Sequence, residues 1–67
     1  MNDIKSIEIP APDFGLNQFV TLYWNDEEIK TRIVARWYDL DHQNWWYKIA
    51  NSEIFYSADV LEKRQEN

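Results

Sequence analysis

The chain has 67 residues, 45% hydrophobic and 16% aromatic, with twelve acidic and seven basic side chains and a formal net charge of −5. This length allows one domain with a thin core, and the lack of cysteine excludes disulfides and thiolate metal sites. The acidic balance repels phosphate backbones at long range, which disfavours general nucleic-acid binding.

The first thirteen residues are expected to form an N-terminal arm ahead of the folded domain. The segment Ser6–Ile9 alternates polar and apolar side chains, a pattern that would suit an edge strand added to this domain or to a partner. Pro10 and Pro12 then end the pairing, because proline has no backbone N–H to donate. The pattern leaves open whether the arm packs on the domain or frays.

The middle of the chain is predicted to consist of β-strands. Over residues 18–56 the hydrophobic pattern has a period of two, and β-branched and aromatic residues dominate. The runs with this pattern are residues 19–24, 29–38, 45–50 and 53–56. They are separated by "NDEE", "DLDHQ" and "NS", which are polar segments typical of turns.

Pairing these runs as consecutive hairpins gives a register in which the apolar rows coincide. Trp24 then lies opposite Ile29, and Trp37 lies opposite Trp45, while Trp46 faces outward. A slip by one residue would move every side chain to the other face, so the agreement of three hairpins supports this register. The predicted core consists of Val20, Leu22, Trp24, Ile29, Ile33, Ala35, Trp37, Trp45, Tyr47, Ile49, Ile54, Tyr56 and Val60.

Four strands followed by "FYSADVLEK" resemble the Src-homology-3-like small barrels, including Tudor-type modules. The resemblance covers roughly Phe14 to Arg64. It implies a helical turn at Ser57–Asp59 and a short fifth strand whose Val60 and Leu61 return to the core. We therefore expect an all-β, five-stranded antiparallel, partly open barrel over residues 14–64, with a polar tail at 65–67.

The sequence does not resemble every subtype of this superfamily equally. The peptide-binding subtype carries an "ALYDY"-like stretch and a proline followed by tyrosine near its end, and neither occurs here. Ser57 stands where that proline would be. Recognition of proline-rich ligands is therefore not implied.

A Tudor-type reader would need an aromatic cage with an acidic residue, because a methylated ammonium is held over ring faces. The residues that could supply such a cage are Tyr38, Asp39, Trp45, Trp46 and Tyr56, with Asp41 as a second acidic candidate. The simpler interpretation is that these rings pack the barrel.

The sequence offers no support for catalysis, a metal or a cofactor. His42 is the only histidine and has no nearby serine or second nitrogen ligand, so it indicates neither a triad nor a zinc site. Asp39 and Asp41 match no calcium-loop spacing. Gly15 is the only glycine, which excludes a glycine-rich phosphate loop.

The most favoured function is a non-catalytic protein-interaction module or accessory subunit that uses an exposed aromatic and basic face. Exposed apolar area on so small a body marks an interface, and homodimerisation is one version of it. The predicted interface residues are Phe19, Tyr23, Val34, Arg36, Trp46, Lys48 and Phe55.

Two alternatives remain at this stage: the cage-type reader and a binder of single-stranded nucleic acid. The second rests on Lys30, Arg32, Arg36 and Lys48, which project beside aromatic side chains. The N-terminal residues lack the basic start and apolar run of a signal peptide, and no apolar run approaches the roughly 20 residues of a membrane span. We expect a cytoplasmic protein without a membrane-spanning segment.

Overall fold

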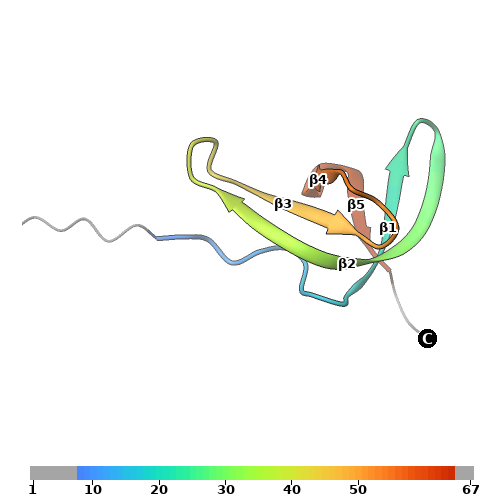
Figure 1. The fold of residues 1–67 in the computed structure, drawn as a ribbon, viewed down its shortest axis with the longest axis horizontal. Helices are drawn as coiled ribbons and strands as arrows, with labels where there is room; N and C mark the ends of the chain where they lie inside the picture. Colours follow the sequence, from blue (N-terminus) through green and yellow to red (C-terminus); the bar gives the residue numbers. More distant parts are fainter. Residues whose placement is uncertain (1–7, 65–67) are drawn as a thin grey trace, which may run out of the picture.

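The structure is a computed structural model that describes residues 8–64. Five antiparallel strands form one sheet in the order β4-β3-β2-β1-β5 (Figure 1). The elements are β1 (Phe19–Trp24), β2 (Glu27–Asp39), β3 (Asn44–Ile49), β4 (Phe55–Ser57), the 3-10 turn η1 (Ala58–Val60) and β5 (Leu61–Lys63). The all-β class, the five antiparallel strands and the helical turn before the last strand are confirmed. The predicted tail and the first seven residues of the predicted arm lie outside the described residues.

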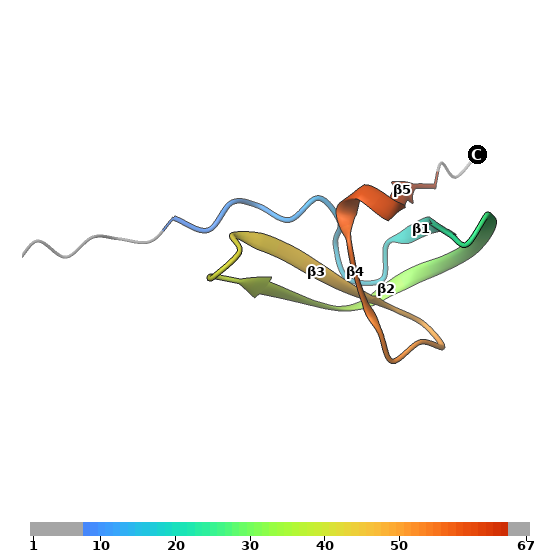
Figure 2. The ribbon, with the colours of Figure 1, turned by 90° about the horizontal axis from the view of Figure 1, so that it is seen from above.

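The sheet is open. β4 and β5 are its two edges, and no pairing joins them within residues 8–64. The long strand β2 pairs with β1 through its first half and with β3 through its second half, so it connects the two parts of the sheet. Seen from above, β4 leads through η1 into β5, which lies beside β1 (Figure 2).

All five strands contribute side chains to the core, as does the segment before β1. The buried residues are Phe14, Val20, Leu22, Ile33, Tyr47, Ile49, Tyr56 and Leu61, with Trp45, Ala58 and Val60 packed against them. Most of the strand positions in this core were predicted from the period of two. Phe14 was missed, because it precedes the alternating pattern and no period marks it.

The first hairpin is tighter than the sequence suggested. Asn25 and Asp26 form a two-residue turn, and both have left-handed backbones, with φ of 52° and 65°. Such turns match the right-handed twist of the flanking strands. Leu22 therefore pairs with Ile29, two residues away from the predicted register. A shift of two keeps each face, but it leaves Trp24 and Ile29 at the edge of the core, 44% and 37% exposed, so their predicted burial is wrong.

A β-bulge in β2 changes the second hairpin. Ile33 pairs with Ile49 as predicted, but Val34 is then an extra residue and the register shifts by one. Trp37 consequently pairs with Trp46 and is 55% exposed. Its predicted place in the core is wrong, because the bulge reverses the faces of the residues that follow it.

Two smaller predictions fail for related reasons. Ile54 is 58% exposed, because β4 begins only at Phe55 and Ile54 remains in the preceding turn. Ala35 follows the bulge and is half-buried opposite Lys48, whereas the predicted register placed it inside opposite Tyr47.

Candidate protein-binding surface

The side of the sheet opposite the core carries a group of aromatic residues. Directly paired residues on antiparallel strands point to the same side of a sheet. Trp37 pairs with Trp46, and Lys48 pairs with Phe55. Because Tyr47, between Trp46 and Lys48, points into the core, these paired residues point away from it. We call Trp37, Trp46, Lys48 and Phe55 the outer patch.

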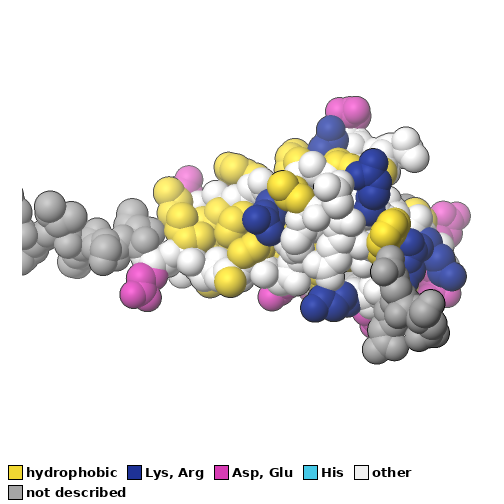
Figure 3. Space-filling view, turned by 90° about the horizontal axis from the view of Figure 1, so that it is seen from below, with side chains coloured by type: hydrophobic (Ala, Val, Ile, Leu, Met, Phe, Trp, Pro, Cys, Tyr) yellow, Lys and Arg dark blue, Asp and Glu magenta, His cyan; other side chains and the backbone are white. Residues whose placement is uncertain are grey.

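The outer patch is accessible. Trp37 is 55% and Phe55 is 40% exposed, while Trp46 and Lys48 are half-buried. Figure 3 shows one face of the molecule, on which hydrophobic side chains gather towards one end and most Lys and Arg side chains lie towards the other. The structure thus brings together three of the predicted interface residues, Trp46, Lys48 and Phe55.

Three other predicted interface residues lie outside the patch but are exposed. Phe19 and Tyr23 lie on β1, where they alternate with the buried side chains of Val20 and Leu22 and so point away from the core. Val34 is the extra residue of the bulge and is 36% exposed. They extend the same side of the sheet.

Arg36 was predicted in the interface but lies on the inner side of the hairpin. Its Nη1 donates a hydrogen bond to the carbonyl oxygen of Phe14 at 3.1 Å, and its guanidinium carbon lies 5.8 Å from the centre of the Trp45 ring. The bulge causes this exchange, because it turns Arg36 inward and its neighbour Trp37 outward. No feature of the alternating pattern could have indicated Trp37 as a surface residue.

Charged groups surround the β1 side of this surface. The guanidinium carbon of Arg64 lies 4.9 Å from the ring centre of Phe19. The Tyr23 hydroxyl donates a hydrogen bond to Glu62 at 3.1 Å. This bond favours the protonated phenol, and with the nearby negative charge of Glu62 and Glu28 it raises the pKa of Tyr23 above 10.0.

The predicted cage does not assemble. Its members were Tyr38, Asp39, Trp45, Trp46 and Tyr56. Tyr38 and Trp45 pair on the inner side, with ring centres 5.2 Å apart in a T-shaped contact. Tyr56 instead packs against Trp24, also at 5.2 Å. Asp39 and Trp46 lie on the opposite side of the hairpin, so the five residues do not line one cavity.

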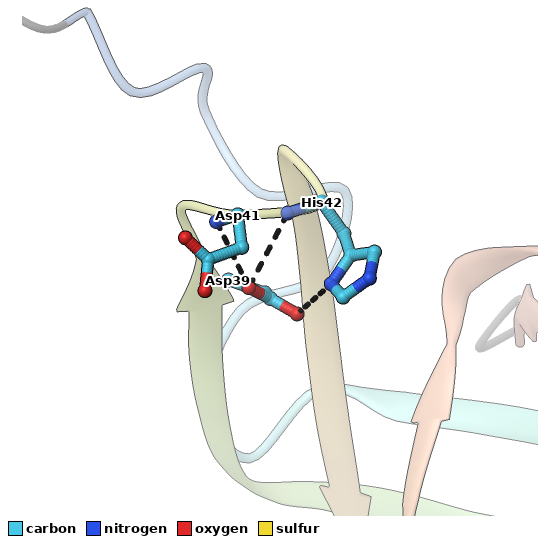
Figure 4. A network of polar contacts seen from close by, with 3 residues as sticks. All are labelled: Asp39, Asp41 and His42. Atoms are coloured by element: carbon cyan, nitrogen blue, oxygen red, sulfur yellow. Dashed lines mark hydrogen bonds and ion pairs between the residues drawn. The ribbon is translucent and has the colours of Figure 1, made fainter.

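The acidic turn between β2 and β3 is held together by its own hydrogen bonds (Figure 4). Asp39 Oδ1 accepts from the backbone N–H groups of Asp41 and His42 at 3.0 and 3.4 Å, and Oδ2 lies 2.7 Å from His42 Nδ1. The side-chain bond to His42 is the main cause that lowers the pKa of Asp39 below 3.8. These contacts fix the shape of the turn that ends the hairpin.

No family model, curated protein or solved structure matches this chain. Within residues 8–64, no helix is long and apolar enough to cross a membrane. The same residues contain no group of three His, Cys, Asp or Glu side chains placed to hold a metal ion. The choice of the outer patch as the candidate site therefore depends only on the geometry described above.

Proposed function

We propose that this chain is a non-catalytic protein-interaction module or accessory subunit that binds its partner through the outer patch. The observation that carries the proposal is the cross-strand pair of Trp37 and Trp46, with Phe55 opposite Lys48, on the side of the sheet that lies away from the core. A few large side chains dominate the binding energy of protein interfaces, and tryptophan is among those enriched there. Exposed large aromatic side chains on one side of a small domain are typical of a binding site.

Charges of both signs lie around the outer patch, and Asp39 lies on the same side of the hairpin as Trp46. Lys48 lies within the patch, and Lys30 and Arg32 alternate along β2 on the side that carries Phe19 and Tyr23. Nearby carboxylates offset part of this charge, since Lys48 Nζ lies 3.7 Å from Glu53. These charges would set the orientation of a partner on the patch, while the rings supply most of the affinity.

We also propose a Src-homology-3-like fold for this domain. Three features support it: β1 lies between β2 and β5, the three central strands form a meander, and a 3-10 turn separates β4 from β5. Such folds serve many functions, so the functional proposal rests on the outer patch and not on the fold.

The test compares partner capture by alanine variants of exposed aromatic residues inside and outside the outer patch. The full chain is immobilised and exposed to an extract of its native cell, and bound proteins are identified by mass spectrometry. Trp37→Ala and Phe55→Ala should abolish capture of the specific partner. Trp24→Ala is the matched control, because Trp24 is also exposed but lies outside the outer patch. Circular dichroism confirms that each variant is folded.

The outcomes separate the proposal from its alternatives. Loss of capture in both patch variants, with retention in Trp24→Ala, supports the proposal. Equal capture by the parent chain and the patch variants would contradict it. If the captured species is single-stranded nucleic acid, its binding falls steeply with salt, and the protein-binding proposal is then wrong.

A further inference from the structure

Basic side chains gather around Phe19 at the start of β1. On one side Phe19 pairs with Arg32 of β2, and on the other its carbonyl oxygen accepts a hydrogen bond from the Arg64 N–H at 3.2 Å. Phe19 therefore lies between two arginines on neighbouring segments. The Arg64 guanidinium lies over the Phe19 ring, which is still 40% exposed. Lys30 and Lys63 lie opposite the next two residues of β1, and we call Lys30, Arg32, Lys63 and Arg64 the basic cluster.

A surface pocket lies beside the Phe19 ring. Its lining residues are Asn17, Gln18, Phe19, Lys63 and Arg64. Asn17 Oδ1 accepts a hydrogen bond from Arg32 Nη1 at 2.9 Å, which holds the Arg32 guanidinium beside this pocket. Guanidinium and ammonium groups are donors that bind carboxylates in charge-assisted hydrogen bonds. The pocket therefore combines donors for an anionic group with a ring that can contact an apolar side chain.

The basic cluster has no ion pair within residues 8–64. The ion pairs of this part of the chain lie in the β2–β3 turn and between β3 and the turn that follows it. The neighbouring acidic residue Glu62 accepts a hydrogen bond from the Tyr23 hydroxyl. Four of the seven basic side chains thus lie together in a chain of net charge −5. Such a local excess attracts an anionic group at short range, because salt screens the more distant acidic groups.

The spacing of the two arginines fits an extended peptide. Neighbouring strands lie about 4.8 Å apart, so the backbones of Arg32 and Arg64, on either side of Phe19, lie roughly 10 Å apart. Alternate residues of an extended peptide point to the same side at intervals of about 6.8 Å. Two acidic side chains with one apolar side chain between them therefore span about 13 Å. The long side chains of arginine and glutamate accommodate the difference.

Single-stranded nucleic acid fits this site less well. Its binding uses several aromatic rings on which successive bases stack, whereas the basic cluster surrounds one ring, Phe19. A nucleic-acid strand also carries one negative charge on every nucleotide, so a net charge of −5 repels it more strongly than a peptide with two carboxylates.

We propose that the basic cluster is a second binding site, which takes an acidic segment of a protein partner with an apolar side chain between two carboxylates. Arg32 and Arg64 pair with the carboxylates, and Phe19 contacts the apolar side chain. This site goes beyond the function proposed for the outer patch. It lies on β1, β5 and the first half of β2, whereas the outer patch lies on β3, β4 and the second half of β2.

The test measures binding of a fluorescently labelled peptide to the full chain by anisotropy. Glutamate and leucine alternate in this peptide, and glutamine replaces every glutamate in the control peptide. We expect Arg32→Gln and Arg64→Gln each to weaken binding of the glutamate peptide about fivefold, because each removes one exposed ion pair. Lys48→Gln is the matched control, since it removes the same charge from the outer patch, and it should weaken binding by less than about twofold. Circular dichroism confirms that each variant is folded.

The outcomes decide the occupant of the basic cluster. Binding of the glutamate peptide but not of the glutamine peptide, weakened in both arginine variants and kept in Lys48→Gln, supports the proposal. No binding to the parent chain, or equal weakening in all three variants, would overturn it. Tighter binding of oligothymidylate than of the glutamate peptide would assign the site to nucleic acid and overturn it as well.

Two further measurements separate this site from other interactions. Self-association of the parent chain that is lost in Arg64→Gln, without peptide binding, would assign the basic cluster to a second copy and contradict the proposal. Trp37→Ala should leave peptide binding unchanged, because Trp37 belongs to the outer patch. Failure of the peptide test therefore leaves the function proposed for the outer patch unaffected.

Discussion

The sequence predicted that two isoleucines of β2 both lie in the core, and the structure separates them. Ile33 is completely buried, whereas Ile29 is 37% exposed at the edge of the core. Valine has nearly the same strand preference as isoleucine, so Ile→Val at each site isolates the loss of one methylene. In a packed core that loss costs about 0.5–1.5 kcal/mol, because the neighbours relax only partly around the gap.

We expect Ile33→Val to lower the free energy of unfolding by about 1 kcal/mol, and Ile29→Val by less than about 0.5 kcal/mol. For a domain of this size, 1 kcal/mol corresponds to about 4–8 °C in Tm. The total stability is roughly 3–10 kcal/mol, so both variants should remain folded. Urea titrations followed by tryptophan fluorescence measure the difference. Equal losses at the two sites would show that Ile29 is buried as the sequence predicted, and its place at the edge of the core would be refuted.

Three further outcomes are expected. Tyr47→Phe should lower stability by about 1 kcal/mol in urea titrations, because the Asp13 N–H loses its partner. The pKa of Asp39 is lowered in the folded state, so its stabilising contribution is present at neutral pH and is lost as the pH falls below 3.8 through the folded pKa. Asp39→Asn should therefore lower Tm at pH 7, and the effect on Tm should diminish in acid. Asp26→Gly should raise Tm by a few degrees and Asp26→Val should lower it, because glycine adopts the left-handed backbone of this turn without steric cost.

The sequence predicted the candidate surface only in strands where the alternation of side chains defined a single inward face. On β3, the pattern predicted that Tyr47 and Ile49 are buried and that their neighbours Trp46 and Lys48 face outward. The structure confirms this division. On β2 beyond Ile33, the sequence contains large aromatic residues at consecutive positions, so either face could be taken as apolar. The period of two therefore could not decide which ring belonged to the outer patch.

The sequence by itself determined the all-β class, four of the five strands and the inward faces of β1 and β3, because Val20 and Leu22, and Tyr47 and Ile49, recur with a period of two. The fifth strand was implied by the resemblance. Only the tertiary structure decided the bulge at Val34 and hence the outward position of Trp37. It also decided the burial of Phe14, which depends on how the arm crosses the sheet. Both depend on contacts between segments distant in the chain, which local periodicity does not encode.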